Sequence, residues 1–380
     1  MTRSKPPFRA DVVGSFLRPE RLKEARRNAG LELESTADFK EEESISLDQL
    51  RVIENECIRE LVDFEKEAGL QVATDGEFRR GSWAYDSIGR FEGVDLRRQD
   101  DGAAFSGTGF QPPVAHTDTK IDRQQGGIVL QDYLFLKNLT DSTIKVTVPS
   151  PTLFYVRGGR EAVNKDVYPD IEVFFEDLTQ AYRDEIQDLS NAGSTYLQID
   201  NTDAALLCDP KFQEAAKRKG LDPKKQIELQ GKLVSMATRD RPDNMTISMH
   251  MCRGNNAGAW LAEGSYDFVA EALFTQFDVD AFFMEYDTER AGDFSALRFA
   301  QKDTFVVLGL VTTKTPENDS KDVLLRRIEE ASAYIPIENL ALSPQCGFAS
   351  VARGNPITFD DQKRKLELIL EVADEVWGSS

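Results

Sequence analysis

The chain has 380 residues, enough for one large α/β barrel or for two ordinary domains. Hydrophobic residues make up 40% and charged residues 29%, which is typical of a soluble globular protein and excludes a disordered one. The formal net charge of −20, with a pI near 4.7, argues against a nucleic-acid partner, because binding a phosphate backbone requires clustered Lys and Arg.

Membrane insertion and secretion are not expected either. No apolar run approaches the length of a membrane span, and the first seven residues lack the apolar core of a signal peptide. The cysteines, Cys57, Cys208, Cys252 and Cys346, are too few for a disulfide framework in a chain of this length. We therefore expect a cytoplasmic protein with no membrane partner, in a reducing compartment that suits thiolate ligands. Whether it forms a homo-oligomer stays open.

The N-terminal part is predicted to contain two strand-helix units. Residues 10–16 have the pattern of a first strand, and a helix is expected over residues 19–28. An amphipathic helix follows over residues 46–67, and Cys57 lies in its apolar stripe, so we assign this cysteine to the core. Residues 72–80 contain the second strand, which breaks at a glycine.

The regular pattern is lost between residues 82 and 142. Gly-rich pieces and a charged span predict an insertion after the second strand, holding a hairpin or small subdomain that includes residues 127–130 and 133–136. His116 lies in this insertion with no ligand spacing around it. We therefore place it in a surface loop.

From residue 142 onward, strands alternate with helices. Strands are predicted at 144–150, 194–200, 245–252, 280–285, 304–311 and 340–344, and helices at 170–192, 224–237, 266–274, 294–299, 321–333 and 358–376. With the two earlier units this makes eight, which predicts a parallel sheet closed as a (β/α)8 TIM barrel. We expect residues 1–380 to form one barrel domain. No Gly-rich phosphate fingerprint follows the first strand, which argues against a dinucleotide-binding sheet.

Polar residues follow the predicted strands at their C-terminal ends, where the active site of a (β/α)8 barrel lies. The residues at these ends are Gly14, Ser15, Asp75, Gly76, Glu77, Asp200, Asn201, His250, Cys252, Glu285, Gln345, Cys346 and Gly347.

His250 and Cys252 are the pair that points to a metal. Residues i and i+2 of a strand project from the same face, and an imidazole beside a thiolate is a ligand pair that zinc favours. Taken alone, the pair is also explained as a buried His and a buried Cys at a strand end. A barrel brings strand ends to one rim, which favours a Zn2+ site of His250, Cys252, Glu285 and Cys346. The alternatives are an ion pair with a nearby Arg for Glu285 and a tight turn for Cys346. Cys208, on a connecting loop, is assigned a structural role.

Zinc with two thiolate ligands suits one kind of chemistry. It is a poor Lewis acid for hydrolysis, but it lowers the pKa of an incoming thiol, which becomes a thiolate nucleophile at neutral pH. A carboxylate is the more replaceable ligand, so we expect a substrate thiol to displace Glu285. The set therefore predicts S-alkylation of a thiol.

These pieces of sequence carry a family resemblance. They are Val13-Gly14-Ser15-Phe16, Asp75-Gly76-Glu77-Phe78, Gln198-Ile199-Asp200, His250-Met251-Cys252, Glu285 and Pro344-Gln345-Cys346-Gly347. They span nearly the whole chain in the right order. The chain resembles the cobalamin-independent methionine synthases, in a short stand-alone form similar to their C-terminal catalytic barrel.

The resemblance implies a reaction and a set of roles. It implies transfer of a methyl group, from methyltetrahydrofolate or another donor, to the thiol of homocysteine, giving methionine. Homocysteine would bind through the backbone near Gly14 and Ser15, with its ammonium held by Glu77 and Asp200, because a buried ammonium needs carboxylate partners. The resemblance also implies the zinc ligands His250, Cys252, Glu285 and Cys346. Asp200 and Lys314 are the residues expected to act in catalysis, with Lys314 or a water assisting the leaving group.

The chain departs from the family pattern on the donor side. The family continues its Asp with Glu-Pro, where this chain has Asn201-Thr202. A folate-stacking Trp is not evident in residues 149–154, and Lys314 stands nearest the place of a family His. The sequence thus leaves open whether the donor is a methylfolate, a methylated small molecule or a methyl group on a corrinoid protein.

Three other functions stay open. One is alkyl transfer to another thiol, as in the epoxyalkane to coenzyme M transferases, although Glu77 and Asp200 disfavour an anionic acceptor. Another is a metal-free barrel like the tetrapyrrole decarboxylases, which Arg79 and Arg80 would serve while leaving His250 unexplained. The third is a zinc that only braces the fold, which ligands spread over about a hundred residues argue against.

Overall fold

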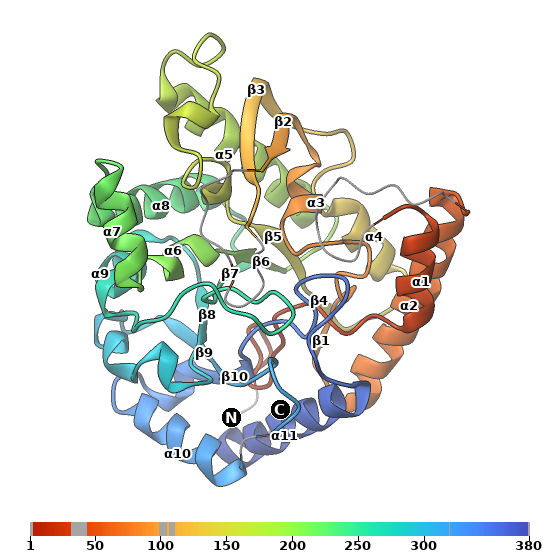
Figure 1. The fold of residues 1–380 in the computed structure, drawn as a ribbon. Helices are drawn as coiled ribbons and strands as arrows, with labels where there is room; N and C mark the ends of the chain where they lie inside the picture. Colours follow the sequence, from red (N-terminus) through yellow and green to blue (C-terminus); the bar gives the residue numbers. More distant parts are fainter. Residues whose placement is uncertain (1–2, 32–43, 99–104, 106–110, 319, 379–380) are drawn as a thin grey trace.

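The computed structural model describes residues 3–31, 44–98, 105, 111–318 and 320–378. Its centre is a parallel six-stranded sheet in the order β10-β9-β8-β7-β6-β5 (Figure 1). The strands are β5 (Val146–Pro149), β6 (Tyr196–Asp200), β7 (Thr246–Met251), β8 (Ala281–Glu285), β9 (Phe305–Val311) and β10 (Leu340–Pro344). Their spatial order follows the chain, and helical segments connect them. The predicted α/β class with a parallel sheet is confirmed.

The register of this sheet aligns the C-terminal ends of its strands. All residues of β8, β9 and β10 are buried, as expected for parallel strands covered on both faces. Asp200 lies opposite His250, which in turn lies opposite Phe283, and Glu285 lies opposite Gly309. The polar residues at the strand ends therefore share one edge.

Shorter parallel contacts extend beyond the six strands. β1 (Val72–Ala73) pairs with β4 (Thr143–Ile144), and Ala10 forms an isolated parallel bridge with Leu342. The prediction of a regular strand over residues 10–16 is wrong, because Gly14 adopts a φ of 143°, which lies outside the β region. Closure of the sheet into a barrel stays a prediction.

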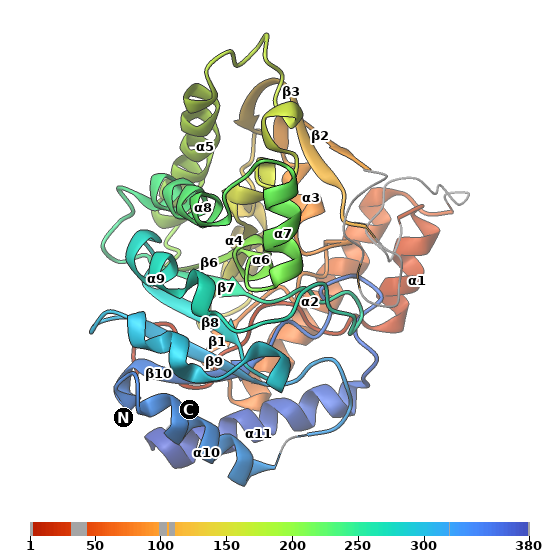
Figure 2. The same cartoon turned by 60° about the vertical axis from the view of Figure 1, so that its left-hand side comes forward.

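Helices surround the strands (Figures 1 and 2). Those that match predicted helices are α1 (Glu20–Asn28), α2 (Leu47–Ala68), α5 (Ile171–Asn191), α8 (Pro223–Thr238), α9 (Asp267–Gln276), α10 (Lys321–Ser332) and α11 (Phe359–Trp377). Ser46 caps α2 with a reciprocal capping box, and Cys57 lies buried in its apolar stripe as predicted. The predicted helix at 294–299 is the 3-10 helix η4 (Phe294–Phe299).

Further helical segments that the sequence pattern did not indicate fill the connections. They are α3 (Tyr85–Ile88), α6 (Thr202–Leu206), α7 (Pro210–Arg218), η1 (Pro151–Phe154), η2 (Gly159–Ala162), η3 (Glu289–Ala291) and η5 (Ile337–Asn339). Cys208 lies buried between α6 and α7.

The predicted insertion contains a hairpin, but not the one expected. The antiparallel strands are β2 (Phe91–Arg97) and β3 (Val114–Arg123), and residues 133–136 belong to helix α4 (Leu130–Lys137). His116 lies within β3 opposite Asp95, so its assignment to a loop is wrong. The exposed face of β3 carries polar and charged residues, which hid the strand pattern. Part of the predicted insertion, residues 99–104 and 106–110, lies outside the described residues.

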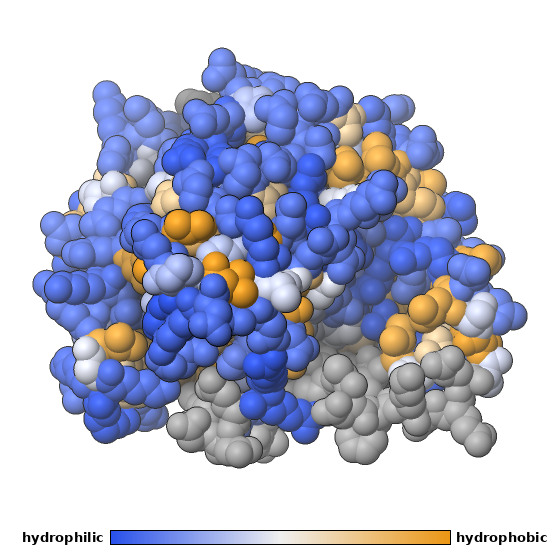
Figure 3. All heavy atoms as spheres, turned by 90° about the horizontal axis from the view of Figure 1, so that it is seen from above, coloured by the Kyte–Doolittle hydropathy of each residue, from blue (hydrophilic) through white to orange (hydrophobic). Residues whose placement is uncertain are grey.

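The surface agrees with the acidic, polar composition. Viewed from above, the molecule presents mostly hydrophilic side chains, with hydrophobic groups in small separate patches (Figure 3). Over the described ranges, none of the helices combines the length and the apolar character that crossing a membrane requires.

Candidate active site and metal centre

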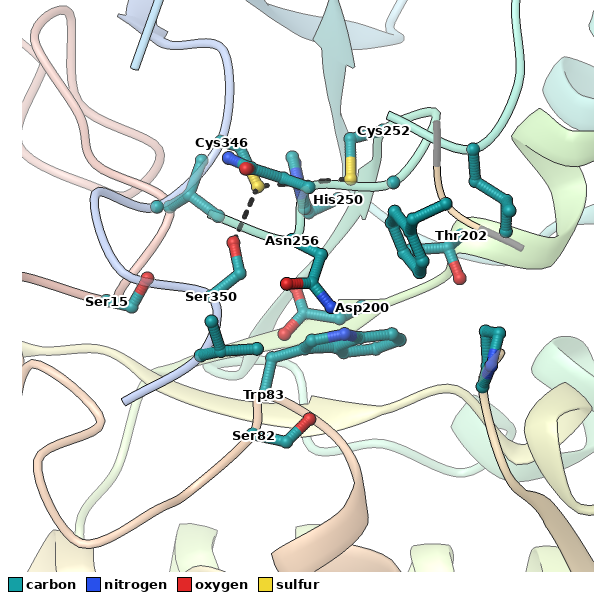
Figure 4. Close-up of a pocket in the computed structure, with 18 of the residues that line it drawn as sticks. Ser15, Ser82, Trp83, Asp200, Thr202, His250, Cys252, Asn256, Cys346 and Ser350 are labelled. Carbon is teal, nitrogen blue, oxygen red and sulfur yellow. Dashed lines mark hydrogen bonds between the residues drawn. The ribbon is translucent and has the colours of Figure 1, made fainter. Parts of the chain in front are cut away.

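A pocket lies where the strands of the sheet end, and it gathers side chains from distant parts of the chain (Figure 4). Its wall includes these residues from predicted strand ends: Ser15, Glu77, Asp200, His250, Cys252, Cys346 and Gly347. The strand-end rule therefore located the pocket correctly.

A cluster of one imidazole and two thiols forms one side of this pocket. The ligand atoms of His250, Cys252 and Cys346 all lie within 4.8 Å of one another, and the two Sγ atoms are 3.9 Å apart. His250 belongs to β7 and Cys252 directly follows it, whereas Cys346 follows β10, and β8 and β9 separate these strands in the sheet. All three side chains are buried. The predicted meeting of these three residues is observed.

The cluster has the properties of a metal-binding site. Neither ring nitrogen of the buried His250 makes a hydrogen bond to any described residue, and such orphaned polar atoms are costly. Cys252 and the nearby His250 ring hold the pKa of Cys346 well below its usual range, against the effect of burial. A thiolate, a second thiol and a free imidazole nitrogen suit a borderline-soft divalent ion such as zinc. These three residues fit the implied metal.

Glu285, the predicted fourth ligand, has a different environment. Its Oε2 accepts a hydrogen bond from the backbone N–H of Arg253 at 2.6 Å, while its Oε1 lies 3.1 Å from Lys314 Nζ and also pairs with Arg290. Burial alone would raise the pKa of Glu285, but Lys314, Arg253 and Arg290 lower it to about 2. Its oxygens do not belong to the cluster of His250, Cys252 and Cys346. The ligand role of Glu285 stays a prediction.

Lys314, the predicted proton donor, is held beside Glu285. Its ammonium lies 2.8 Å from Asp287 Oδ2 as well as 3.1 Å from Glu285 Oε1. It is buried, and the residues described as the pocket wall do not include it. Its role in proton transfer stays a prediction.

Glu77 and Asp200 form the acidic side of the pocket. Thr147 Oγ1 donates to Glu77 at 3.1 Å, and Gln198 Nε2 donates to Asp200 at 2.8 Å. Burial raises the pKa of Glu77 to about 7 and that of Asp200 to about 6. Each carboxylate therefore gains from a cation placed beside it.

Close backbone packing holds the Gly14-Ser15 segment against the end of β10. Phe348 N–H donates to the Ser15 carbonyl at 2.9 Å. A Cβ atom on Gly347 would lie 1.8 Å from Ser15 Oγ, and one on Gly14 would lie 3.3 Å from Glu77 Oε1. A side chain at Gly347 would therefore collide with Ser15 at the pocket wall, whereas at Gly14 the φ of 143° is what favours glycine.

Several residues of the site escaped the sequence analysis. Trp83, Asn256 and Ser350 line the pocket, with Ser350 Oγ 3.6 Å from Cys346 Sγ (Figure 4). Arg253 and Arg290 hold Glu285. The turn-forming residues 253–256, directly after His250 and Cys252, were the one available signal for part of this set. Trp83 and Arg290 follow no strand pattern that would have marked them.

Comparisons with known proteins agree on one family. The family model described as "Cobalamin-independent synthase, Catalytic domain" matches residues 10–373. The protein YxjG of Bacillus subtilis (strain 168), itself uncharacterized, is 40% identical over 99% of this chain and 97% of its own length. The methionine synthase of Pyrococcus horikoshii is 22% identical over 92% of this chain and 88% of its own. A solved structure from Listeria monocytogenes, provisionally assigned as a vitamin-B12-independent methionine synthase, matches with a TM-score of 0.76 at 34% identity, covering 99% of this chain and 100% of that one.

Proposed function

Because the chain belongs to the family of the cobalamin-independent synthase catalytic domain, we propose that it is a zinc-dependent S-methyltransferase that methylates homocysteine to methionine. The observation that carries the proposal is the arrangement of the pocket. A His/Cys/Cys cluster forms one side, and two buried carboxylates line the same pocket. The first suits a thiol and the second suits an ammonium, and homocysteine has both groups.

We also propose that the sheet is part of a closed (β/α)8 barrel in a single domain, residues 1–380, with residues 82–142 inserted. Two observations support closure. Cys252 and Cys346 approach each other although two strands separate β7 from β10, so the sheet curves strongly. At one edge of the sheet, Ala10 forms a bridge with Leu342 of β10. At the other edge, the N–H of Lys145, directly before β5, donates a hydrogen bond to the Ala73 carbonyl. Both edges are thus connected to N-terminal segments.

In the proposed site, His250, Cys252 and Cys346 hold zinc, with Glu285 as a fourth, exchangeable ligand. When bound, the metal supplies a thiolate nucleophile at neutral pH by lowering the pKa of the substrate thiol. His250 and the two cysteines are buried, which keeps water from competing at the sulfur.

The acidic side positions the amino-acid end of the acceptor. We assign the ammonium of homocysteine to Glu77 and Asp200, and its carboxylate to the backbone near Gly14 and Ser15. The buried Arg80, 3.8 Å from Glu77, keeps part of the negative charge balanced before substrate arrives. An anionic acceptor such as a sulfonated thiol would meet the two carboxylates unfavourably, which supports an amino acid over coenzyme M.

We assign the methyl donor, a methylfolate or another compound, to the side of the pocket that Trp83 forms. The indole of Trp83 lies at the pocket wall opposite the sulfur atoms, beside Asn256 and Asp200 (Figure 4). It offers a flat apolar surface for a donor. Lys314, which stands nearest the place where the family has a His, or a water is assigned to assist the leaving group.

A tetrapyrrole decarboxylase is a poorer fit. Arg79 Nη1 is paired with Asp132 at 2.9 Å, and Arg80 Nη1 bonds Thr147 Oγ1 at 2.9 Å. These guanidinium groups are committed within the protein, and the unpaired imidazole of His250 would have no role.

The test is the zinc content of purified protein, wild type against Cys346→Ser, followed by X-ray absorption with homocysteine. We expect about one zinc per chain, lost or weakened in the variant, and an added sulfur neighbour when homocysteine is present. Ser332→Ala, at the C-terminal end of α10, is the control substitution, and this variant must keep its zinc. If the protein holds about one zinc but its X-ray absorption spectrum does not change with homocysteine, the acceptor is another thiol. If the protein holds no zinc, the proposal is overturned.

A further inference from the structure

Gln198, a fully buried residue of β6, joins two parts of the pocket wall that come from distant parts of the chain. Its Nε2 donates one hydrogen bond to the Val13 carbonyl, at 2.7 Å, and a second to Asp200 Oδ1, at 2.8 Å. Both partners are acceptors, so the two hydrogens of one amide group are fully used. We propose that Gln198 is a positioning residue that fixes Asp200 and the Gly14-Ser15 segment relative to each other, and thereby holds both ends of the amino-acid acceptor. The inference rests on the proposed function.

Packing alone does not account for an amide at this position. Gln198 is 0% exposed, and its Oε1 has no hydrogen-bond partner among the described residues. A buried amide oxygen without a partner costs free energy, which an apolar side chain of similar length, such as methionine, would avoid. The two hydrogen bonds from Nε2 are what the glutamine adds. Both of them go to residues of the pocket wall, Val13 and Asp200.

The amide of Gln198 lies one layer below the acidic side of the pocket. Residues i and i+2 of a strand share a face, so Gln198 and Asp200 point to the same side of the sheet. In the neighbouring strand β5, Thr147 is the register partner of Gln198, and its hydroxyl donates to Glu77 at 3.1 Å. The two carboxylates that we assign to the ammonium are therefore supported by adjacent side chains of one layer.

The other partner of Gln198, the Val13 carbonyl, belongs to the peptide group that leads into Gly14. Gly14 has a φ of 143°, and the backbone of a glycine has more freedom than that of any other residue, so this segment needs anchors on both sides. Thr74 Oγ1 donates to the Gly14 carbonyl at 3.0 Å and provides the anchor on one side. Gln198 provides the anchor on the other side and links the segment to Asp200.

These two hydrogen bonds prepare the pocket for a ligand that reaches both places at once. A carboxylate that can rotate, or a glycine segment that can shift, must be ordered when the ligand binds, and the cost of ordering reduces the affinity. Gln198 orders both before the ligand arrives. Because one amide group supports both places, its loss weakens the binding of the ammonium and the binding of the carboxylate alike.

The test uses full-length, zinc-loaded protein and four thiols that differ in their end groups. They are homocysteine, 4-mercaptobutyrate without the ammonium, 3-aminopropanethiol without the carboxylate, and 1-propanethiol without either group. Calorimetric titration gives the Kd of each. Gln198→Met keeps the length of the side chain and removes the amide. The matched control is Gln230→Met, because Gln230 is also fully buried, on α8, with neither amide atom hydrogen-bonded to a described residue.

We expect Gln198→Met to bind homocysteine about tenfold more weakly, as for the loss of a hydrogen bond to a charged group. The thiols 4-mercaptobutyrate and 3-aminopropanethiol should each bind about threefold more weakly, because each depends on one of the two places. The Kd for 1-propanethiol and the zinc content should not change. Gln230→Met should bind all of the thiols as wild type does. Gln198→Asn, whose shorter side chain cannot reach both partners, should show the same pattern and replaces Gln198→Met if that variant does not fold.

The possible failures are distinguishable. If the wild-type protein binds zinc but not homocysteine, the proposed function fails, and the role of Gln198 with it. If wild type binds homocysteine and Gln198→Met binds every thiol as tightly, the role of Gln198 alone is overturned. A loss confined to thiols with an ammonium, or to thiols with a carboxylate, would overturn the link between the two ends. An equal loss for 1-propanethiol, or a loss of zinc, would mean that Gln198 only maintains the fold, which also overturns the proposal.

Discussion

Two sets of buried carboxylates border the proposed active site, and they have opposite acid-base properties. Glu77 and Asp200 have pKa values raised to about 7 and about 6, whereas the pKa of Glu285 falls to about 2. All three are buried, and burial raises the pKa of each. The difference comes from cations: three surround Glu285, while Arg80 beside Glu77 offsets burial only in part. Glu77 and Asp200 can therefore be stabilised by a cationic group of a substrate, whereas Glu285 is already stabilised by cations of the protein.

The largest expected effect comes from removing the Glu285 carboxylate from among the three cations that surround it. Glu285→Ala leaves Arg253, Arg290 and Lys314 without their shared partner, and breaking a buried pair in this way costs about 3–5 kcal/mol. Urea unfolding of metal-stripped protein measures this cost. The matched control is Glu161→Ala, since Glu161 is exposed and pairs with Lys165 at the surface. If Glu285→Ala lowers the unfolding free energy by no more than Glu161→Ala does, the three cations do not stabilise the Glu285 carboxylate.

A smaller effect is expected on the acidic side. Glu77→Gln keeps the shape of the side chain but removes its charge, so homocysteine should bind about 10- to 100-fold more weakly, through the loss of a charge-assisted bond to its ammonium. Calorimetric titration of the zinc-loaded protein measures this. The thiol 3-mercaptopropionate, which lacks the ammonium, serves as a control ligand and should bind both proteins equally. An equal loss for both ligands would contradict the ammonium assignment.

The smallest effect is a difference in the pH dependence of stability. The native state holds a proton on Glu77 up to about pH 7, while the unfolded state loses it near its ordinary value of 4.5. Between these values the native state binds more protons, so the unfolding free energy falls as pH rises. In wild type this fall should exceed that in Glu77→Gln by about 2 kcal/mol between about pH 5 and 7.

The sign is opposite for Glu285, whose lowered pKa adds stability above pH 4.5 that is lost as pH falls toward 2. Denaturant titrations of apo protein at four or five pH values test both signs. Parallel curves for wild type and Glu77→Gln would mean that Glu77 ionises normally.

Much of the pocket was predictable because it follows from strand geometry. His250 and Cys252 share a face by the two-residue period, and parallel strands bring Cys346 and Asp200 to the same edge. An ion pair of Glu285 with an arginine was one of the alternatives from the sequence, and it is observed. The identity of its partners was not predictable, since Arg290 and Lys314 reach it from connecting segments whose paths depend on long-range packing. The first predicted strand failed at Gly14, whose φ of 143° an alternating apolar pattern does not reveal.

The order of the metal-binding residues along the chain has a consequence for protein synthesis. Cys346 follows Cys252 by 94 residues and lies just after β10, and in the described part of the chain α11 is the one regular α-helix that comes after it. A growing chain therefore presents an incomplete His-Cys pair until β10 has been made and has joined the sheet. On the proposed function, the complete set of ligands exists only once β10 has joined the sheet, so loading of the metal follows folding of the sheet.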